Sequence, residues 1–151
     1  MDLIASTTYN SIRKTVQYLS DIPPHPELET FQINMPATHA TVIANWRVYI
    51  EALVKRLSEQ PTQPTHVVAV IDTIASKPGV VLPWKEMVKI CKEHAIWTVV
   101  DGAHSIGQEQ NIEVAKSGCD FWVSVSARCD HVLLDHAHYL IELLQMVDVQ
   151  T

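Results

Sequence analysis

An aspartate and a histidine three residues apart are the residues of this chain whose types and spacing could do chemistry. They end the stretch Trp97-Thr-Val-Val-Asp101-Gly-Ala-His104, in which an apolar segment leads directly into the carboxylate. Open α/β sheets bind ligands at the carboxyl ends of their strands, and an unpaired buried charge costs several kcal/mol. We therefore expect a cationic partner for Asp101. The alternative is that Asp101 caps the N-terminus of a following helix.

The residues around this pair predict an α/β fold. Val67–Ile71 and Ile96–Val100 are unbroken apolar runs, which are typical of strands buried on both faces of a parallel sheet. Pro83 opens a helix between them at the favoured first position. This order of elements predicts a right-handed crossover, and Asp120–Ser124 is expected to form the next strand.

Further elements are expected on both sides of this unit. Helices are predicted over Asn10–Leu19, Ala37–Leu57 and Ile112–Lys116, and strands over Leu3–Ala5 and Thr30–Met35. A parallel sheet needs helices on both faces and covered edges. We therefore expect a partial three-layer α/β/α sandwich with a mostly parallel sheet, as part of a larger domain.

Composition excludes several classes of partner. The 151 residues carry a formal net charge of −6, whereas binding to nucleic acid or to a membrane surface needs clustered Lys and Arg. No segment approaches the roughly 20 apolar residues of a membrane span, and the N-terminal residues lack the pattern of a signal peptide. Three cysteines do not form an even disulfide framework. The expected location is therefore the cytoplasm, with reduced thiols.

The C-terminal part of the chain offers a second kind of site. Cys129, Asp135, His136 and His138 are residue types that bind metals, and a zinc-binding module is one interpretation. The alternative is the solvated face of an amphipathic helix within the apolar segment Val132–Val147.

Four segments of the chain, taken in order, resemble one known family. They are Ser6-Thr-Thr-Tyr9-Asn-Ser-Ile, Ile74-Ala-Ser76-Lys-Pro-Gly79-Val-Val-Leu-Pro83, Val99-Val-Asp101-Gly-Ala-His104-Ser-Ile-Gly-Gln108 and Gly118-Cys-Asp120-Phe-Trp-Val-Ser124. From about Ser6 to Ser124 the chain resembles the class V aminotransferases, which are fold-type I pyridoxal-phosphate enzymes. It is most similar to the isopenicillin N epimerase-like branch, which includes cysteine desulfurase-like and C–S lyase relatives.

The resemblance implies a cofactor site made of four residues. Asp101 would pair with the pyridinium nitrogen and keep it protonated, so that the cofactor can accept electrons from a carbanion. His104 would hydrogen-bond the phenolic oxygen of the ring, Tyr9 would stack on the ring face, and Ser76 would lie near the cofactor or the substrate carboxylate. Tyr9 and Ser76 could equally be ordinary surface or turn residues.

The resemblance ends before the residue that does the covalent chemistry. The family continues with a Ser-Asn-x-His-Lys-Trp pattern, in which the Lys forms the Schiff base, whereas this chain reads Ser124-Val-Ser-Ala-Arg128 and has no lysine after Lys116. Arginine stays protonated and is a poor nucleophile, so we assign no catalytic residue. Residues 1–124 are expected to be the central part of the large domain, and residues 125–151 a divergent helical segment.

Beside the zinc-binding interpretation, the resemblance leaves two functions open. One is a fragment of an enzyme that acts on amino acids by transamination, epimerisation or C–S cleavage, inactive as given; full-length relatives are expected to be homodimers. The other is a non-catalytic remnant or binding module with the same fold. The residue at position 128 discriminates between them.

Overall fold

The computed structural model describes residues 1–23, 27–59 and 66–124, and in this part of the chain five strands form one sheet. The strands are β1 (Asp2–Ala5), β2 (Leu28–Phe31), β3 (Val68–Asp72), β6 (Trp97–Asp101) and β7 (Phe121–Val123). They lie in the order β2-β1-β3-β6-β7, and all neighbours are parallel. The predicted α/β class and parallel sheet are confirmed.

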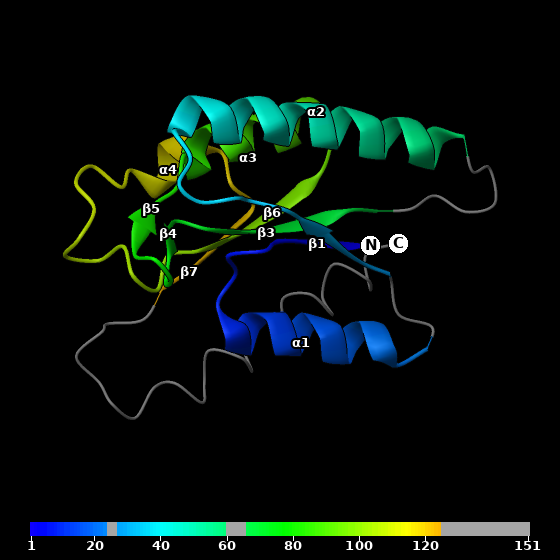
Figure 1. Cartoon of the computed structure of the whole chain (residues 1–151), viewed down its shortest axis with the longest axis horizontal. Coiled ribbons are helices and arrows are strands. Elements are labelled where there is room, and N and C mark those ends of the chain that lie inside the picture. Colours follow the sequence, from blue (N-terminus) through cyan, green and yellow to red (C-terminus); the bar gives the residue numbers. More distant parts are fainter. Residues whose placement is uncertain (24–26, 60–65, 125–151) are drawn as a thin grey trace.

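The order of the strands fixes where a ligand site is expected. β2 pairs with one side of β1, and β3 pairs with the other side. Open α/β sheets bind ligands at the carboxyl ends of strands where the strand order reverses in this way. These carboxyl ends lie on the left in Figure 1, on the side of the short hairpin of β4 (Ile74–Ala75) and β5 (Val80–Val81).

Helices cover both faces of the sheet. In Figure 1, α2 (His39–Ser58) and α3 (Trp84–Glu93) lie above it, and α1 (Asn10–Asp21) lies below. The buried residues of α1 recur at helical spacing and pack against one face of the central strands; they are Ile12, Val16 and Leu19, against Ile4, Val68, Val70 and Val99. The layered arrangement follows because a parallel sheet is apolar on both faces.

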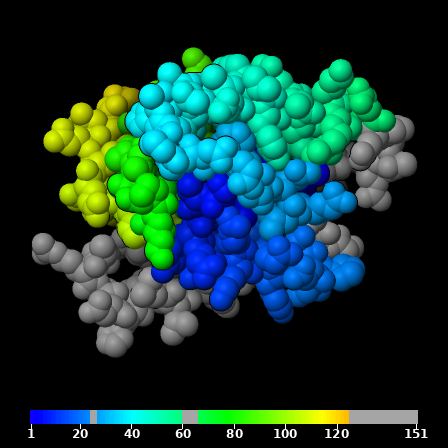
Figure 2. All heavy atoms as spheres, in the orientation of Figure 1, coloured from blue at the N-terminus to red at the C-terminus, as the bar shows by residue number. Residues whose placement is uncertain are grey.

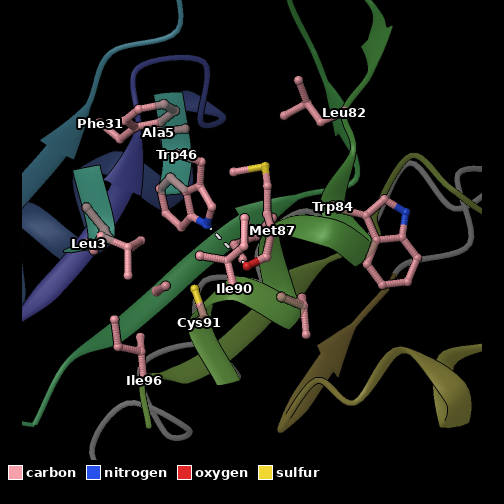
Figure 3. Packing of buried hydrophobic residues seen from close by; sticks show 14 of the residues in the cluster. Leu3, Ala5, Phe31, Trp46, Leu82, Trp84, Met87, Ile90, Cys91 and Ile96 are labelled. Atoms are coloured by element: carbon pink, nitrogen blue, oxygen red, sulfur yellow. Dashed lines mark hydrogen bonds between the residues drawn. The ribbon is translucent and has the colours of Figure 1, made fainter. Parts of the chain in front are cut away.

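The larger core cluster lies between the sheet and the helices α2 and α3 (Figure 3). Trp46 of α2 is buried, and its Nε1 donates a 3.1 Å hydrogen bond to the carbonyl oxygen of Met87 in α3. A buried indole N–H needs such a partner. The ring of Phe31, at the end of β2, packs edge-on against Trp46 with 4.9 Å between ring centroids. This cluster ties both helices to the sheet.

Several predicted boundaries are wrong. The strand expected over Thr30–Met35 is β2, Leu28–Phe31, because it pairs residue for residue with β1 and this pairing ends with Phe31 opposite Ala5. Pro83 is the N-cap of α3 rather than its first residue.

Two small features also differ from expectation. The helix expected over Ile112–Lys116 is α4, Val114–Ser117, and it ends at Gly118, which adopts a left-handed conformation directly after it. The hairpin of β4 and β5 was not predicted, because each of its strands has only two residues. Residues 125–151, including the helix expected over Val132–Val147, lie outside the described part of the chain.

Candidate functional site

Asp101 ends β6 at the carboxyl edge of the sheet and is buried, with 7% of its surface exposed. Its Oδ1 accepts a 2.9 Å hydrogen bond from the main-chain nitrogen of Ala103. The capping alternative is wrong, because residues 102–113 form turns and loops and α4 begins only at Val114. Asp101 therefore organises the turn that carries His104.

A second buried carboxyl group, that of Asp72, ends the neighbouring strand. The parallel pairing of β3 with β6 sets Asp72 opposite Asp101, and Asp72 is only 4% exposed. The sequence reasoning missed this residue. The signal was present, since Asp72 follows the apolar run Val67–Ile71 directly, just as Asp101 follows its own run.

The negative charge of Asp101 influences the ionisation of Asp72. Burial, and then the negative charge of Asp101, raise the pKa of Asp72 from its usual 3.8 to about 7. Burial disfavours the ionised carboxylate, and two adjacent carboxylates resist ionising together. With a pKa of about 7, the Asp72 carboxyl group is therefore about half protonated near neutral pH.

The loop after β1 is hydrogen-bonded to the Asp72 carboxyl group. Thr8 Oγ1 donates a 2.9 Å hydrogen bond to Asp72 Oδ2, and the main-chain N–H of Tyr9 also donates to the Asp72 carboxyl group. Tyr9 is the N-cap of α1 and has no side-chain cap bond of its own. A carboxyl group from β3 thus supplies a contact that orients the start of α1.

The structure brings Tyr9 and His104 together. Their rings meet edge-on, with 6.4 Å between centroids and 81° between planes. Both residues are exposed, Tyr9 by 38%, and the N-terminal residues (dark blue in Figure 2) form part of the surface on that face. Two of the predicted site residues, distant in sequence, therefore lie side by side next to Asp101 and Asp72.

Ser76 is less closely tied to the others. It follows β4 in the hairpin and is half-buried. Within the described ranges no hydrogen bond joins its side chain to Tyr9, Asp101 or His104. It remains a neighbour at the same edge of the sheet, on the chain that leaves Asp72.

A polar network holds the turn after Asp101. Thr73 donates to the carbonyl oxygen of Asp101 through both its main-chain nitrogen, at 3.0 Å, and its Oγ1, at 3.2 Å. Ser105 Oγ, fully buried, lies 2.6 Å from Thr73 Oγ1. Glu109 lies 3.2 Å from Ser105 Oγ and accepts a 2.8 Å bond from the indole of Trp84. Because buried polar groups must be satisfied, this network fixes residues 101–109.

Gly102 is required by the close approach of β7. A Cβ built on Gly102 would lie 2.2 Å from Cζ2 of Trp122. The main-chain nitrogen of Gly102 donates a 2.7 Å bond to the carbonyl of Val123, and Ser124 Oγ donates to the carbonyl of Gly102 at 2.9 Å. The glycine therefore lets β7 and the turn after Asp101 pack against each other.

The described residues lack the features of two other kinds of site. No group of three or more His, Cys, Asp or Glu side chains in them could hold a metal ion. None of their helices is long and apolar enough to cross a bilayer. The residues of the metal hypothesis, Cys129, Asp135, His136 and His138, lie outside the described ranges, as does Arg128.

The fold and this carboxyl-edge site define a class of protein. The model of the family described as aminotransferase class-V matches residues 12–128, so the chain belongs to this family. The expectation drawn from the four sequence segments is confirmed. Membership also identifies the family's cofactor, pyridoxal phosphate, as the one that the fold implies.

Two curated proteins and one solved structure are similar to this chain. The chain is 28% identical over 130 residues to the L-cysteine desulfhydrase-like protein lolT1 of Epichloe uncinata, covering 82% of this chain and 27% of that protein. It is 32% identical over 121 residues to the L-cysteine desulfhydrase of Arabidopsis thaliana, covering 77% and 24%. The NifS-like protein of Rickettsia africae ESF-5 shares the fold, with a TM-score of 0.58, 16% identity, and coverage of 82% of this chain and 29% of that one. The chain therefore spans about a quarter of the length of its curated relatives.

The residues at the carboxyl edge fit the implied cofactor. A buried carboxylate such as that of Asp101 can hold a proton on the nitrogen of an aromatic ring, which is the contact that this cofactor needs from the protein. The hydroxyl of Thr7, in the loop after β1, is buried without a hydrogen-bond partner in the described part of the chain. A buried hydroxyl without a partner costs about 1–3 kcal/mol, a cost that a polar ligand at this edge can remove.

Proposed function

We propose that this chain forms the ring-binding part of a pyridoxal-phosphate site, within the large domain of a class-V aminotransferase-like enzyme that acts on amino acids. The observation that carries the proposal is the buried carboxylate of Asp101 at the end of β6, with the rings of Tyr9 and His104 beside it. Residues 1–124 are the central part of that domain, and residues 125–151 are a separate segment.

Each residue of the site has a distinct role in this proposal. Asp101 holds the proton on the ring nitrogen, since an ion pair offsets the cost of burying its charge. Tyr9 covers a face of the ring, and His104 hydrogen-bonds the phenolic oxygen. Ser76 lies near the cofactor or the substrate carboxylate. The cofactor, when bound, supplies an acceptor for negative charge that develops at the substrate α-carbon.

The reaction class that we propose first is carbon–sulfur cleavage. Two of the relatives carry names that specify L-cysteine desulfhydrase activity or likeness to it, and a third is a hercynylcysteine sulfoxide lyase of Schizosaccharomyces pombe, 32% identical over 85 residues. Transamination and epimerisation are the other reactions that the same site supports, because all three begin with loss of the proton from the substrate α-carbon.

We further propose that the chain as given does not turn over substrate. Arg128 stands at the position of the family's Schiff-base lysine, and no lysine follows Lys116. A guanidinium group stays protonated and cannot act as the amine nucleophile. A non-catalytic protein that binds the cofactor or a partner is therefore the second candidate, and the arginine is the observation that favours it.

The cellular setting completes the proposal. We place the protein in the cytoplasm, since Cys91 and Cys119 are free thiols in the described part of the chain, as expected in a reducing compartment. Full-length relatives are proposed to be homodimers.

Pyridoxine 5′-phosphate tests the binding proposal, because it lacks the aldehyde and cannot react with surface lysines. Its affinity is measured by fluorescence titration of the purified chain and of Asp101→Asn. We expect Asp101→Asn to weaken binding about tenfold or more, since a charge-assisted contact is lost. Asp2→Asn is the matched control, because Asp2 is equally buried but lies at the opposite end of the strands. Equal affinities for the wild-type chain and Asp101→Asn would contradict the site.

A sulfide-release assay with L-cysteine and pyridoxal phosphate tests the proposed inactivity. The chain is expected to release no more sulfide than protein-free cofactor does. Release well above that background would refute the role assigned to Arg128.

A further inference from the structure

The carboxyl group of Asp72 has contacts on two sides that no assigned role uses. On one side it lies opposite Asp101, across the pairing of β3 with β6. On the other side it accepts hydrogen bonds from Thr8 Oγ1, at 2.9 Å, and from the main-chain nitrogen of Tyr9. It is 4% exposed, so these neighbours and not water form its surroundings.

This position links two parts of the site that the chain itself keeps apart. Tyr9 belongs to the loop after β1, and in the sheet β3 lies between β1 and β6. Asp72 ends that intervening strand. Its contact with the start of α1 therefore determines where the ring of Tyr9 lies relative to Asp101 and His104.

We infer that Asp72 is a positioning residue of the cofactor site: it fastens Thr8 and Tyr9 to the end of β3, and so holds the Tyr9 ring over the place where Asp101 meets the cofactor. The inference rests on the proposed function for the identity of the ligand. Asp72 need not touch the cofactor, since it acts through Thr8 and Tyr9.

Two substitutions at position 72 distinguish a positioning role of Asp72 from an effect of its charge. Asparagine at position 72 keeps an oxygen that can accept from both Thr8 and Tyr9, whereas alanine keeps none. Asp72→Asn should therefore preserve the position of the loop, and Asp72→Ala should release it. Thr8→Val removes one of the two bonds and should have an intermediate effect.

Two measurements on the whole chain test the inference. The first is amide hydrogen exchange of the peptide that covers residues 6–9, with the buried strand β6 as internal reference. Asp72→Ala is expected to speed exchange at Tyr9 about tenfold or more, the factor that corresponds to losing one buried hydrogen bond. Asp72→Asn is expected to stay close to wild type. Thr15→Val is the control, because it makes the same substitution as Thr8→Val at a buried threonine of the adjoining helix α1.

The second measurement is the affinity for pyridoxine 5′-phosphate. Asp72→Ala is expected to weaken binding about tenfold, Thr8→Val less, and Asp72→Asn to restore most of the affinity. This rescue is not expected of a residue that only fills space. Unchanged affinity in Asp72→Ala, beside a wild-type chain that binds, would overturn the role of Asp72 alone. A wild-type chain that does not bind at all would overturn the proposed function, and the cofactor role of Asp72 with it.

Discussion

Replacing Asp72 with asparagine should remove a loss of stability that the wild-type chain undergoes as the pH rises. The cause is the environment of this carboxyl group at the end of β3. Burial, together with the neighbouring charge of Asp101, raises the pKa of Asp72 from its usual 3.8 to about 7 in the folded protein. The groups that face it are Asp101 from β6 and the polar atoms of Thr8 and Tyr9 at the start of α1.

The sign of the effect follows from where the proton resides. Between the usual pKa of 3.8 and about 7, the folded protein retains a proton on Asp72 that the unfolded chain has released. The free energy of unfolding therefore falls as the pH rises through this interval and levels off above it. Since each pKa unit corresponds to about 1.4 kcal/mol, the whole interval is worth about 4 kcal/mol. That is a large share of the roughly 5–15 kcal/mol by which folded proteins are stable.

Urea unfolding, followed by tryptophan fluorescence, measures this effect at several pH values from 4.5 to 8. The quantity of interest is the difference in unfolding free energy between wild type and Asp72→Asn, because titrating groups that do not interact with Asp72 cancel in it. We expect wild type to lose about 3 kcal/mol relative to Asp72→Asn between pH 4.5 and 8, because part of the effect lies below pH 4.5. Asp21→Asn, the same substitution at the exposed end of α1, is the control for the substitution itself. A difference between wild type and Asp72→Asn that is constant with pH would refute the reasoning.

Three further predictions follow from packing. Gly102→Ala should lower the unfolding free energy by about 1–3 kcal/mol or more, because the added Cβ would lie 2.2 Å from Trp122; an unchanged melting temperature would contradict this close approach. Trp46→Phe should cost about 1–3 kcal/mol in urea unfolding, since it leaves a main-chain carbonyl of α3 without its partner; a loss no larger than the experimental error would show that the bond contributes nothing. Burial raises the pKa of Cys91 to about 12, so this thiol should be alkylated at pH 8 much more slowly than the half-buried Cys119. Mass spectrometry of the two peptides measures both rates, and equal rates in the native protein would contradict the burial of Cys91.

Much of the fold could be predicted because its signals are local. The apolar runs before Asp72 and Asp101 mark two buried strands, and the periodic residues of α1 and α2 mark amphipathic helices. The misplaced boundary of β2 shows the limit of such signals. Its extent is set by the residues of β1 that it pairs with, and that partner is remote in the sequence.

Some residues of the candidate site could likewise be found from local sequence signals, and others could not. Asp101 and His104 could be found from the sequence, because a carboxylate directly after a buried strand lies at the edge of a parallel sheet. Asp72 was missed although it follows the same pattern, since the predicted crossover does not fix the register that sets Asp72 opposite Asp101. Ser76 remains a prediction, as does the role of Arg128.

The sequence by itself determined the family, the parallel strands and the position of Asp101 at the end of one of them, because these depend on residue types and spacing within short segments. Only the tertiary structure decided which side chains meet. The pairing of β3 with β6 sets Asp72 against Asp101, and the packing of α1 on the sheet brings Thr8 and Tyr9 to that carboxyl group. Such contacts arise between segments far apart in the chain, where burial and hydrogen bonding, and not local preference, determine the geometry.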